Sequence, residues 1–334
     1  MSEPPDFKVE ITGHVWAKDL LKRQKDSDRV PQSLLITGPA QVGKSSLARY
    51  FAQYLNCRGE APPCGRCISC RKVISGNHPD IRIFDDDNAP LKIDQVRGLQ
   101  RELLLSPLEG PFRVALLCNF ERATASAANA LLKTLEEPAA PVVMILTAVD
   151  PGGLLPTIVS RCQILTLRPL PDSEIRETLQ SRWQASPDQA ELLAQLAAGR
   201  LGWAVRALED EEFLERRASS LTDMLDLLAM PRAERLAYAN VMSRNVLALK
   251  AMLTLWLTIW RDLLLLKIES ETRIINLDWQ ETLQDVARRS TLSQVEQMIF
   301  KLQAALLNLD RNVNPRLNLE VVLLKLPSIR DISR

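Results

Sequence analysis

The sequence predicts an α/β domain built on a parallel sheet, followed by a region that is helical throughout. Two observations carry this prediction. Up to about residue 168, short apolar runs alternate with amphipathic segments, the pattern of strand–helix–strand units. Beyond that point leucine-rich helical patterns take over, and no run reads as a strand.

Five apolar runs are expected to form the strands. Each has four to six residues rich in Ile, Leu and Val and is bounded by Gly, Pro, Asp or Asn. Strands of a parallel sheet read as continuous apolar runs because helices cover both faces. The expected strands are Ser33–Thr37, Ile81–Phe84, Val114–Cys118, Val142–Thr147 and Ile164–Leu167.

Three amphipathic helices are expected between these strands. They are Ser45–Leu55, Ile93–Leu104 and Thr124–Glu137, and Pro138 stops the last of them. Together the strands and helices predict a doubly wound domain over residues 1–168.

Two helical domains are expected after a linker that begins at Arg168. The first, residues 169–210, holds two or three helices within 173–207, with Gly199 and Gly202 in a turn. The second, residues 211–334, contains long helices such as Val246–Ile268 and Leu292–Leu309.

Composition limits the possible functions. Forty-two Lys and Arg against 41 Asp and Glu give the 334 residues a net charge of +1, so no overall basic field holds nucleic acid. The most apolar stretch, Ala251–Trp260, is shorter than the roughly 20 residues of a membrane helix. The N-terminal segment has no apolar signal region. We expect a cytoplasmic protein without a membrane partner.

The segment Gly38–Ser45, GPAQVGKS, is a complete phosphate-binding loop (P-loop) sequence between an expected strand and an expected helix. Gly38 and Gly43 allow the backbone to point its N–H groups at phosphate oxygens. Lys44 brings its charge to the β- and γ-phosphates, and the Ser45 hydroxyl can ligate Mg²⁺. The expected nucleotide-binding residues are Gly38, Pro39, Gly43, Lys44, Ser45 and Ser46.

The strand that should supply the acids of an NTPase ends unusually. Hydrolysis needs one carboxylate that orients Mg²⁺ and another that polarises water. This strand ends in Cys118 and Asn119, neither of which is a base at neutral pH, and Glu121 comes later. The acids Asp85–Asp87 after the preceding strand are an alternative. We expect weak or absent ATP hydrolysis.

Four of the six cysteines lie within fourteen residues, in the pattern C-x6-C-x2-C-x2-C: Cys57, Cys64, Cys67 and Cys70. Four soft ligands at this spacing fit a closed, structural Zn²⁺ site in a loop too short to fold by burial alone. An iron–sulfur cluster also takes four cysteines, but nothing else indicates redox chemistry. Cys118 and Cys162 are expected to fill the core.

Further motifs follow the P-loop and the cysteines in order: Asn77–Ile81 (NHPDI), Asn129–Pro138 (NALLKTLEEP) and Ser160–Cys162 (SRC). Together they resemble the bacterial AAA+ clamp loader subunits of DNA polymerase III, and within that group the delta-prime family. The segment Asn312–Glu320 is similar to the last collar helix of the family, so the resemblance reaches nearly the whole chain.

The resemblance implies roles for individual residues. Arg161 matches the arginine finger given in trans to the ATP of a neighbouring subunit, where a guanidinium neutralises charge on the γ-phosphate. Thr147, at the end of the fourth strand, matches the sensor position that contacts the γ-phosphate or the attacking water. The segment Asn129–Pro138 would form part of a subunit interface.

The sequence also departs from the motor subunits of the family. Cys118 and Asn119 stand where those subunits carry Asp and Glu. Gly202 stands where they carry a lid arginine, for which Arg200 or Arg206 could substitute. Loss of both features with Arg161 kept is what the resemblance implies for a largely non-hydrolysing delta-prime subunit. The complete P-loop departs from delta-prime relatives that have lost it and implies that this chain binds ATP.

The resemblance therefore implies an AAA+ domain with a zinc knuckle at 57–70, a helical lid domain and a helical collar domain. The implied cofactors are ATP, Mg²⁺ and Zn²⁺. The implied setting is a hetero-oligomer of clamp loader subunits that acts on the sliding clamp and on primed DNA, with the assembly gripping the duplex.

Three other functions fit parts of the sequence. An ATP-hydrolysing gamma/tau motor subunit would need the acids that the third strand lacks. A P-loop phosphotransferase would need a substrate acid or base near the phosphates. A zinc-dependent DNA-binding module would use the basic residues Arg58, Arg66, Arg71 and Lys72.

Overall fold

The computed structural model describes residues 11–86, 89–138, 141–311 and 313–329. The chain divides into two compact units, one of Met1–Ala190 with Gly199–Trp203 and one of Glu191–Ala198 with Ala204–Arg334. The division into three domains stays a prediction. Asp87, one of the alternative acids, and Asn312, which opens the collar motif, lie outside the described residues.

The first unit is built on a parallel sheet of five strands in the order β2-β3-β4-β1-β5. The expected parallel α/β sheet is confirmed, and three strands differ from the expected bounds by one residue at one or both ends. The strands are β1 (Ser33–Thr37), β2 (Ile81–Phe84), β3 (Arg113–Leu117), β4 (Val142–Ala148) and β5 (Gln163–Thr166).

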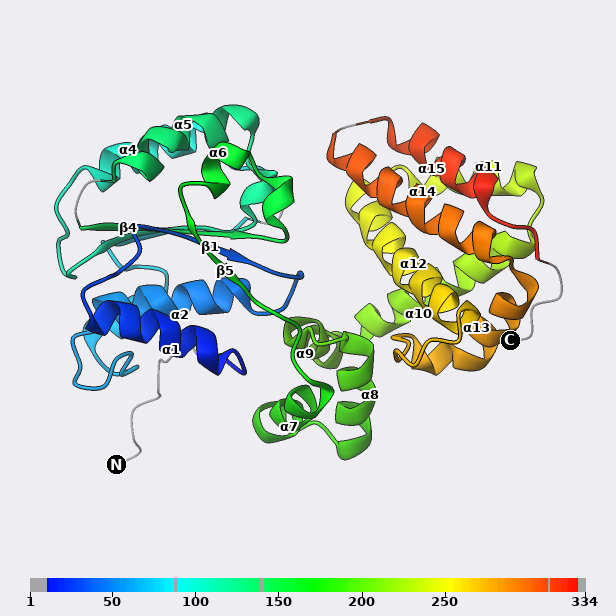
Figure 1. Ribbon diagram of the computed structural model, residues 1–334, viewed down its shortest axis with the longest axis horizontal. Helices are drawn as coiled ribbons and strands as arrows, with labels where there is room; N and C mark the ends of the chain where they lie inside the picture. Colours follow the sequence, from blue (N-terminus) through cyan, green and yellow to red (C-terminus); the bar gives the residue numbers. More distant parts are fainter. Residues whose placement is uncertain (1–10, 87–88, 139–140, 312, 330–334) are drawn as a thin grey trace. The chain divides into compact units, whose positions relative to one another are not determined.

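Helices cover both faces of this sheet (Figure 1). Successive side chains of a strand point to opposite faces, so Leu34 and Ile36 pack with α1 and α2, whereas Leu35 packs with α4 and α5. The helices of the first unit are α1 (Val15–Asp26), α2 (Lys44–Asn56), α3 (Ile68–Ile74), α4 (Ile93–Leu103), α5 (Ala125–Glu136), α6 (Pro156–Val159) and α7 (Asp172–Trp183). Two short 3-10 turns, η1 (Phe120–Arg122) and η2 (Pro151–Gly153), follow β3 and β4.

The helix α5 shows how the sequence sets these boundaries. Thr124 was expected to be its first residue and is its N-cap, because its hydroxyl accepts the N–H of Ala127 at 3.2 Å. Pro138 lies just beyond the C-cap Glu137 and cannot continue the helix.

Every described element beyond β5 is helical, as expected. The helices α8 (Pro187–Ala197) and α9 (Leu201–Glu209) give residues to both units. The second unit continues with α10 (Glu211–Ala229), α11 (Arg232–Met242), α12 (Val246–Lys267), η3 (Leu277–Trp279), α13 (Gln280–Arg289), α14 (Leu292–Asp310) and α15 (Pro315–Lys325).

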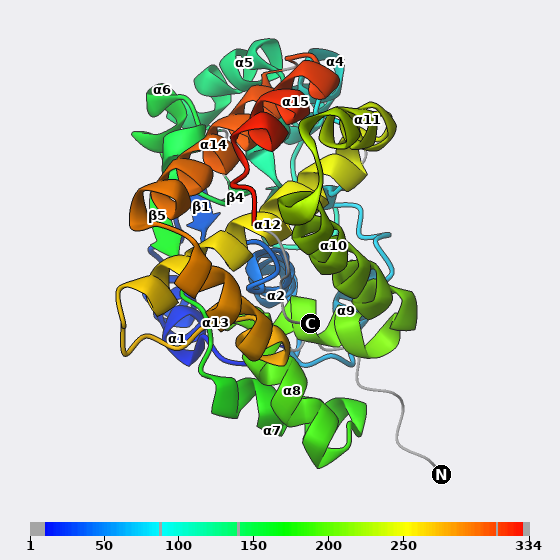
Figure 2. The same cartoon turned by 90° about the vertical axis from the view of Figure 1, so that its right-hand side faces the viewer.

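The long helix α12 is the centre of the second unit. It packs against α10, α13 and α14, while α15 packs against α11 and α14 (Figure 2). Trp256 and Trp260 of α12 are fully buried in this core. Within the described part of the chain, no helix is long and apolar enough to cross a membrane.

Two buried arginines hold segments of the second unit together. Arg217 donates to the carboxylate of Asp278 and to the side-chain oxygen of Asn276. Arg235, only 2% exposed, donates to backbone carbonyl oxygens. These belong to Leu228, Met230, Leu323, Leu326 and Pro327. A buried guanidinium is tolerated because its donors are satisfied.

Candidate nucleotide and metal sites

The loop after β1 has the backbone conformation that phosphate binding requires. Gly38 has φ 138° and Gly43 has φ 106°, values that glycine adopts without strain. A Cβ on Gly38 would lie 2.5 Å from the carbonyl oxygen of Leu167, so only glycine fits there. Gly43 is the N-cap of α2, whose first-turn N–H groups and dipole favour a bound anion.

The side chain of Lys44 folds back over this loop. Its Nζ donates to the carbonyl oxygens of Gly38 and Pro39, both at 2.8 Å. Burial lowers the pKa of Lys44, and the nearby Glu121 and Cys118 oppose that shift without cancelling it. The ammonium group is therefore hydrogen-bonded to uncharged carbonyl oxygens. A bound phosphate would offer it a charged acceptor instead.

Two neighbours outside the P-loop support it. The imidazole of His14, which is buried, lies with Nε2 3.0 Å from the carbonyl oxygen of Val42. The N–H of Gly202 donates to the carbonyl oxygen of Gln41 at 3.0 Å, and a Cβ on Gly202 would meet that oxygen at the same distance. Gly202 thus lies in the first turn of α9, not in the expected turn, which Gly199 forms with φ 80°.

The two candidate replacements for the lid arginine lie in different units. Arg200 is in the unit of the P-loop, where its guanidinium stands 5.9 Å from the ring centre of Trp203 and burial lowers its pKa. Arg206 belongs to the second unit and stacks on Phe213 at 4.7 Å. The replacement itself stays a prediction.

The carboxyl ends of β2 and β3 meet beside the P-loop. The N–H of Cys118 donates to the carbonyl oxygen of Phe84 at 2.8 Å. Burial raises the pKa of the Cys118 thiol to about 11, and Ser45 and Asp85 lie close enough to it to influence that pKa. Asp85 in turn accepts a bond from Arg49 at 2.6 Å. A neutral thiol therefore stands next to the serine of the P-loop.

The two cysteines outside the cluster pack against the core clusters of the first unit. For Cys162 this is the expected role. Cys118 packs against the core as well, with Ser45 and Asp85 near enough to its thiol to affect its pKa.

The end of β4 carries the expected sensor residue, Thr147, which is fully buried. Its hydroxyl oxygen accepts the N–H of Asn119 at 3.0 Å, a bond that leaves the hydroxyl proton for another acceptor. In η1, Glu121 comes back toward Lys44. Burial raises the pKa of Glu121, against the lowering effect of its own N–H, of Lys44 and of the N–H of Val149. The carboxylate that comes late in the sequence therefore lies near the phosphate loop.

Arg161 lies just after α6 and is held within the chain. Its Nε donates to Oε1 of Glu136 at 2.8 Å, and its Nη2 contacts the same oxygen. Its Nη1 donates to the carbonyl oxygen of Thr157 at 2.8 Å. The side chain remains 31% exposed. The SRC motif and the end of the NALLKTLEEP motif, which holds Glu136, therefore touch.

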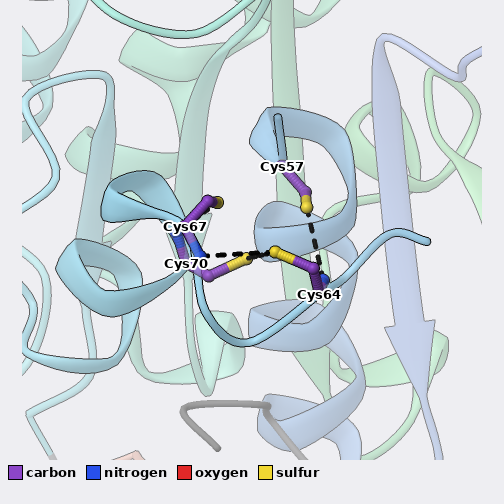
Figure 3. Close-up of side chains that lie close together, drawn as sticks. All are labelled: Cys57, Cys64, Cys67 and Cys70. Carbon is purple, nitrogen blue, oxygen red and sulfur yellow. Dashed lines mark hydrogen bonds between the residues drawn. The ribbon is translucent and has the colours of Figure 1, made fainter. Parts of the chain in front are cut away.

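The four clustered cysteines come together at one point (Figure 3), with sulfur atoms within 4.8 Å of one another. Cys57 follows the end of α2, and Cys67 and Cys70 lie at the start of α3. Backbone N–H groups point at three of the sulfurs at 3.3–3.4 Å, which stabilises thiolates. Burial alone would raise the pKa of Cys64, but N–H donors lower it to about 6.

The donor set fits a zinc ion. Four thiolates can give Zn²⁺ a closed tetrahedral shell with no open position for substrate. The loop that brings them together depends on Gly59, where a Cβ would lie 2.7 Å from both side-chain atoms of Cys64. The arrangement therefore supports a structural metal site.

The NHPDI motif connects this cysteine knuckle to the sheet. Nδ1 of His78 accepts the N–H of Asp80 at 3.1 Å, so the proton lies on Nε2, which is 3.0 Å from the Ser69 hydroxyl. That hydroxyl donates to the carbonyl oxygen of Asn56 at 2.7 Å. The buried Asp80 carboxylate accepts three N–H groups at 2.6–2.7 Å, those of Leu108, Glu109 and Gly110.

Two basic residues of the knuckle are engaged within the chain. Lys72 forms an ion pair with Glu109 at 2.5 Å, and Arg58 donates to the backbone oxygen of the same residue. Because both side chains hold the 108–110 segment, this geometry gives the DNA-binding alternative no support.

The P-loop sequence, the parallel sheet in its strand order and the helical region after it define a P-loop protein of the AAA+ fold class. The family model described as DNA polymerase III, delta subunit, matches residues 13–171. The DNA polymerase III subunit delta' of Bacillus subtilis is 31% identical over 300 residues, 88% of this chain and 90% of the relative. The chain belongs to the delta-prime family of DNA polymerase III subunits.

Two further relatives agree with this assignment to the clamp loader group. The subunit delta' of Pseudomonas aeruginosa is 34% identical and covers 66% of this chain and 70% of the relative. The subunit tau of Escherichia coli is 33% identical over 204 residues, 59% of this chain but only 32% of tau. The delta-prime similarity therefore extends over more of both chains.

Proposed function

We propose that this chain binds ATP with Mg²⁺ and works as the delta-prime subunit of a hetero-oligomeric clamp loader, which places a sliding clamp on primed DNA for the replicative polymerase. Membership of the delta-prime family supports the role and makes the other loader subunits its partners. The sliding clamp and the primed DNA are proposed as partners because the delta-prime role implies them.

One observation carries the nucleotide part of the proposal. The P-loop has two glycines at positive φ and a buried lysine whose donors meet at the loop's own carbonyl oxygens. This arrangement offers N–H groups, a helix N-terminus and a positive charge to a triphosphate. Gly38, Pro39, Gly43, Lys44, Ser45 and Ser46 would contact it.

The proposed contribution to hydrolysis is made in trans. Cys118 supplies no carboxylate at the end of β3, so the chain's own turnover is expected to be weak or absent. Arg161 is partly exposed and is the proposed arginine finger for a neighbouring subunit, once it leaves Glu136. Thr147 is the proposed sensor, with its hydroxyl proton as donor.

Zn²⁺ is the proposed metal of Cys57, Cys64, Cys67 and Cys70. It would cross-link the end of α2 to the start of α3. A chain without the metal is expected to keep its sheet and lose the fold of this knuckle.

The first test measures ATP binding and phosphate release by the purified, zinc-loaded chain, with Lys44→Ala as the control. We expect binding in the wild type, at least tenfold weaker binding in the variant, and equal phosphate release from both. Release on the order of 1 s⁻¹ that disappears in Lys44→Ala would instead support the gamma/tau motor function.

The second test uses a loader reconstituted with motor subunits. Arg161→Ala should lower the ATP turnover of the assembly by at least about tenfold, as expected for loss of an arginine finger. Arg161→Lys keeps the charge but lacks the planar, forked guanidinium, and it should restore little of the lost ATP turnover. Unchanged turnover in a correctly assembled Arg161→Ala loader would refute the role.

A further inference from the structure

One oxygen of the Glu121 carboxylate is buried without a hydrogen-bond partner. No donor of the described residues reaches this atom, Oε2. Within that part of the chain, Glu121 is the one ionisable side chain with a buried oxygen or nitrogen that lacks a partner. Asp80 shows the usual situation, because its buried carboxylate accepts three N–H groups. An unpartnered buried carboxylate oxygen costs free energy of folding, so it points to a partner from outside the chain.

The turn after β3 brings Glu121 to the carboxyl edge of the sheet. Asn119 has φ 50°, in the left-handed region that asparagine adopts more readily than most residues, and the chain turns there into η1. Phe120 is buried in the core and fixes the turn. The N–H of Asn119 donates to the Thr147 hydroxyl at 3.0 Å, which places the start of η1 against the end of β4.

The P-loop is tied to the end of the same strand. The order of the sheet puts β4 between β3 and β1. The N–H of Gly38, at the start of the P-loop, donates to the carbonyl oxygen of Val149 at 3.2 Å. A Cβ on Gly153 of η2 would lie 3.9 Å from the Cβ of Glu121. The segment 149–153 after β4 therefore touches the P-loop at one end and Glu121 at the other.

Lys44 is the basic residue of the P-loop that lies near Glu121. The two are close enough for the charge of each to influence the pKa of the other. Lys44 does not satisfy Oε2 of Glu121, since its Nζ donates to the carbonyl oxygens of Gly38 and Pro39. A carboxylate at this place repels a bare triphosphate and attracts a divalent cation. The site therefore favours a nucleotide that arrives with its cation.

We propose that Glu121 is the anionic partner of the divalent cation of a bound nucleotide, with Oε2 as the oxygen that binds it, directly or through a coordinated water. This inference rests on the proposed binding of ATP with Mg²⁺. It assigns to Glu121 the cation-binding part of the role that a carboxylate at position 118 would fill. A base to polarise water is still missing at Asn119, so the chain gains affinity for the cation and no turnover.

The test measures the Kd for ATP of the full, zinc-loaded chain in buffer with Mg²⁺ and in buffer without added divalent cation. The wild type should bind more tightly with Mg²⁺. Glu121→Gln keeps the shape of the side chain but not its charge, and should reduce this Mg²⁺-dependent gain by at least about tenfold, the effect of one charge-assisted contact. Without Mg²⁺ the variant should bind ATP at least about threefold more tightly than the wild type, because the repulsion is gone.

Glu102→Gln is the matched control. Glu102 forms an exposed ion pair with Arg82 in the same unit, and its substitution changes the net charge by the same amount. Both of its affinities should equal those of the wild type. Thermal unfolding of each variant checks that the fold is kept. If Glu121→Gln does not fold, Glu121→Ala decides the result with the same expectations.

An unchanged Mg²⁺-dependent gain in Glu121→Gln would overturn the inference and leave ATP binding in place. A loss of affinity of equal size in both buffers would also overturn it, because the carboxylate would then support the loop and not the cation. Wild-type binding that gains nothing from Mg²⁺ would refute it as well. Absence of ATP binding by the wild type would refute the proposed nucleotide function and this inference together.

Discussion

Arg161 and Glu136 form an ion pair that joins the turn after α6 to the last residue of α5. Both side chains are partly exposed, 31% and 48%, and the guanidinium also donates to the backbone oxygen of Thr157. The arginine proposed to serve a neighbouring subunit is thus already aligned by its own chain. If Arg161 moves to the ATP of a neighbouring subunit, its guanidinium exchanges the carboxylate of Glu136 for a phosphate, so that one anionic partner replaces another.

Glu136→Gln is expected to free Arg161 without harming the fold. A surface pair of this kind contributes about 0–1 kcal/mol, so urea unfolding should shift little. In a reconstituted loader, ATP turnover should be equal to or above that of the wild type, in contrast to Arg161→Ala. A loss as large as that of Arg161→Ala would show instead that Glu136 orients the arginine.

Removal of the metal is expected to loosen two segments that are far apart in sequence. The knuckle at 57–70 should lose amide protection in hydrogen exchange because no cation then joins its four cysteines. The 108–110 segment should lose part of its protection, since Lys72 and Arg58 hold Glu109. Asp80 is expected to retain the rest.

The comparison of Cys70→Ser with Cys162→Ser gives the control for that result. Both variants remove one thiol from the first unit, but only Cys70 belongs to the cluster. Loss of protection at 108–110 in Cys162→Ser as well would mean that general destabilisation, and not the metal site, is the cause.

Gly38→Ala should destabilise the chain and abolish ATP binding. The new Cβ would meet the carbonyl oxygen of Leu167 at 2.5 Å, and φ 138° is strained for any other residue. We expect a loss of about 1–3 kcal/mol in the free energy of unfolding, measured by urea titration.

Gly98→Ala is the matched substitution. Gly98 lies inside α4, where an added Cβ has nothing within 4 Å among the described residues. The free energy of unfolding should rise by about 0.5–1 kcal/mol, the usual helix preference for alanine. Equal effects of the two substitutions would contradict the argument from the P-loop geometry.

The three tyrosines contribute to the pH dependence of stability at the alkaline end. Burial raises the pKa of Tyr50 and of Tyr238, and it raises the pKa of Tyr54 to about 12. The hydroxyl of Tyr54 also donates to Asp26, and that of Tyr238 donates to Asp223. At these three residues the folded state therefore binds more protons than the unfolded state above pH 10. Their contribution to stability is complete below the ordinary tyrosine pKa of about 10 and falls as pH rises.

Tyrosinate absorbance during an alkaline titration measures this directly. The folded chain should titrate at higher pH than the chain in urea, and Tyr238→Phe should remove part of the difference. Identical titration curves in both states would contradict the burial of these phenols.

The parts of the fold that sequence predicts best are those encoded locally. Each buried strand is a short apolar run, and the P-loop combines two glycines with a lysine at a fixed spacing. The helix α3 has only seven residues, and α1 carries few apolar residues, so periodicity gave neither of them. Because α1 is not predicted, the role of its N-cap His14, which contacts the carbonyl oxygen of Val42 in the P-loop, is not predicted either.

Contacts between distant segments could not be predicted in the same way. Arg49 and Asp85 are 36 residues apart, and only the pairing of β2 with β3 brings the acid to α2. The cysteine cluster, in contrast, could be predicted from the spacing of its residues, because all four lie within one short loop and its flanking helices. Whether a residue's role was visible in the sequence thus depended on how much of its surroundings lay nearby along the chain.

The position of Arg235 bears on the order in which the chain can fold during synthesis. Its guanidinium needs the carbonyl oxygens of Leu323, Leu326 and Pro327, and the N–H of Ile329 donates to Leu228 in the same region. The sheet, by contrast, is complete once Thr166 has been made. The sheet can therefore fold early in synthesis, while the helical unit must wait until Ile329 has been made, with its arginine uncompensated until then.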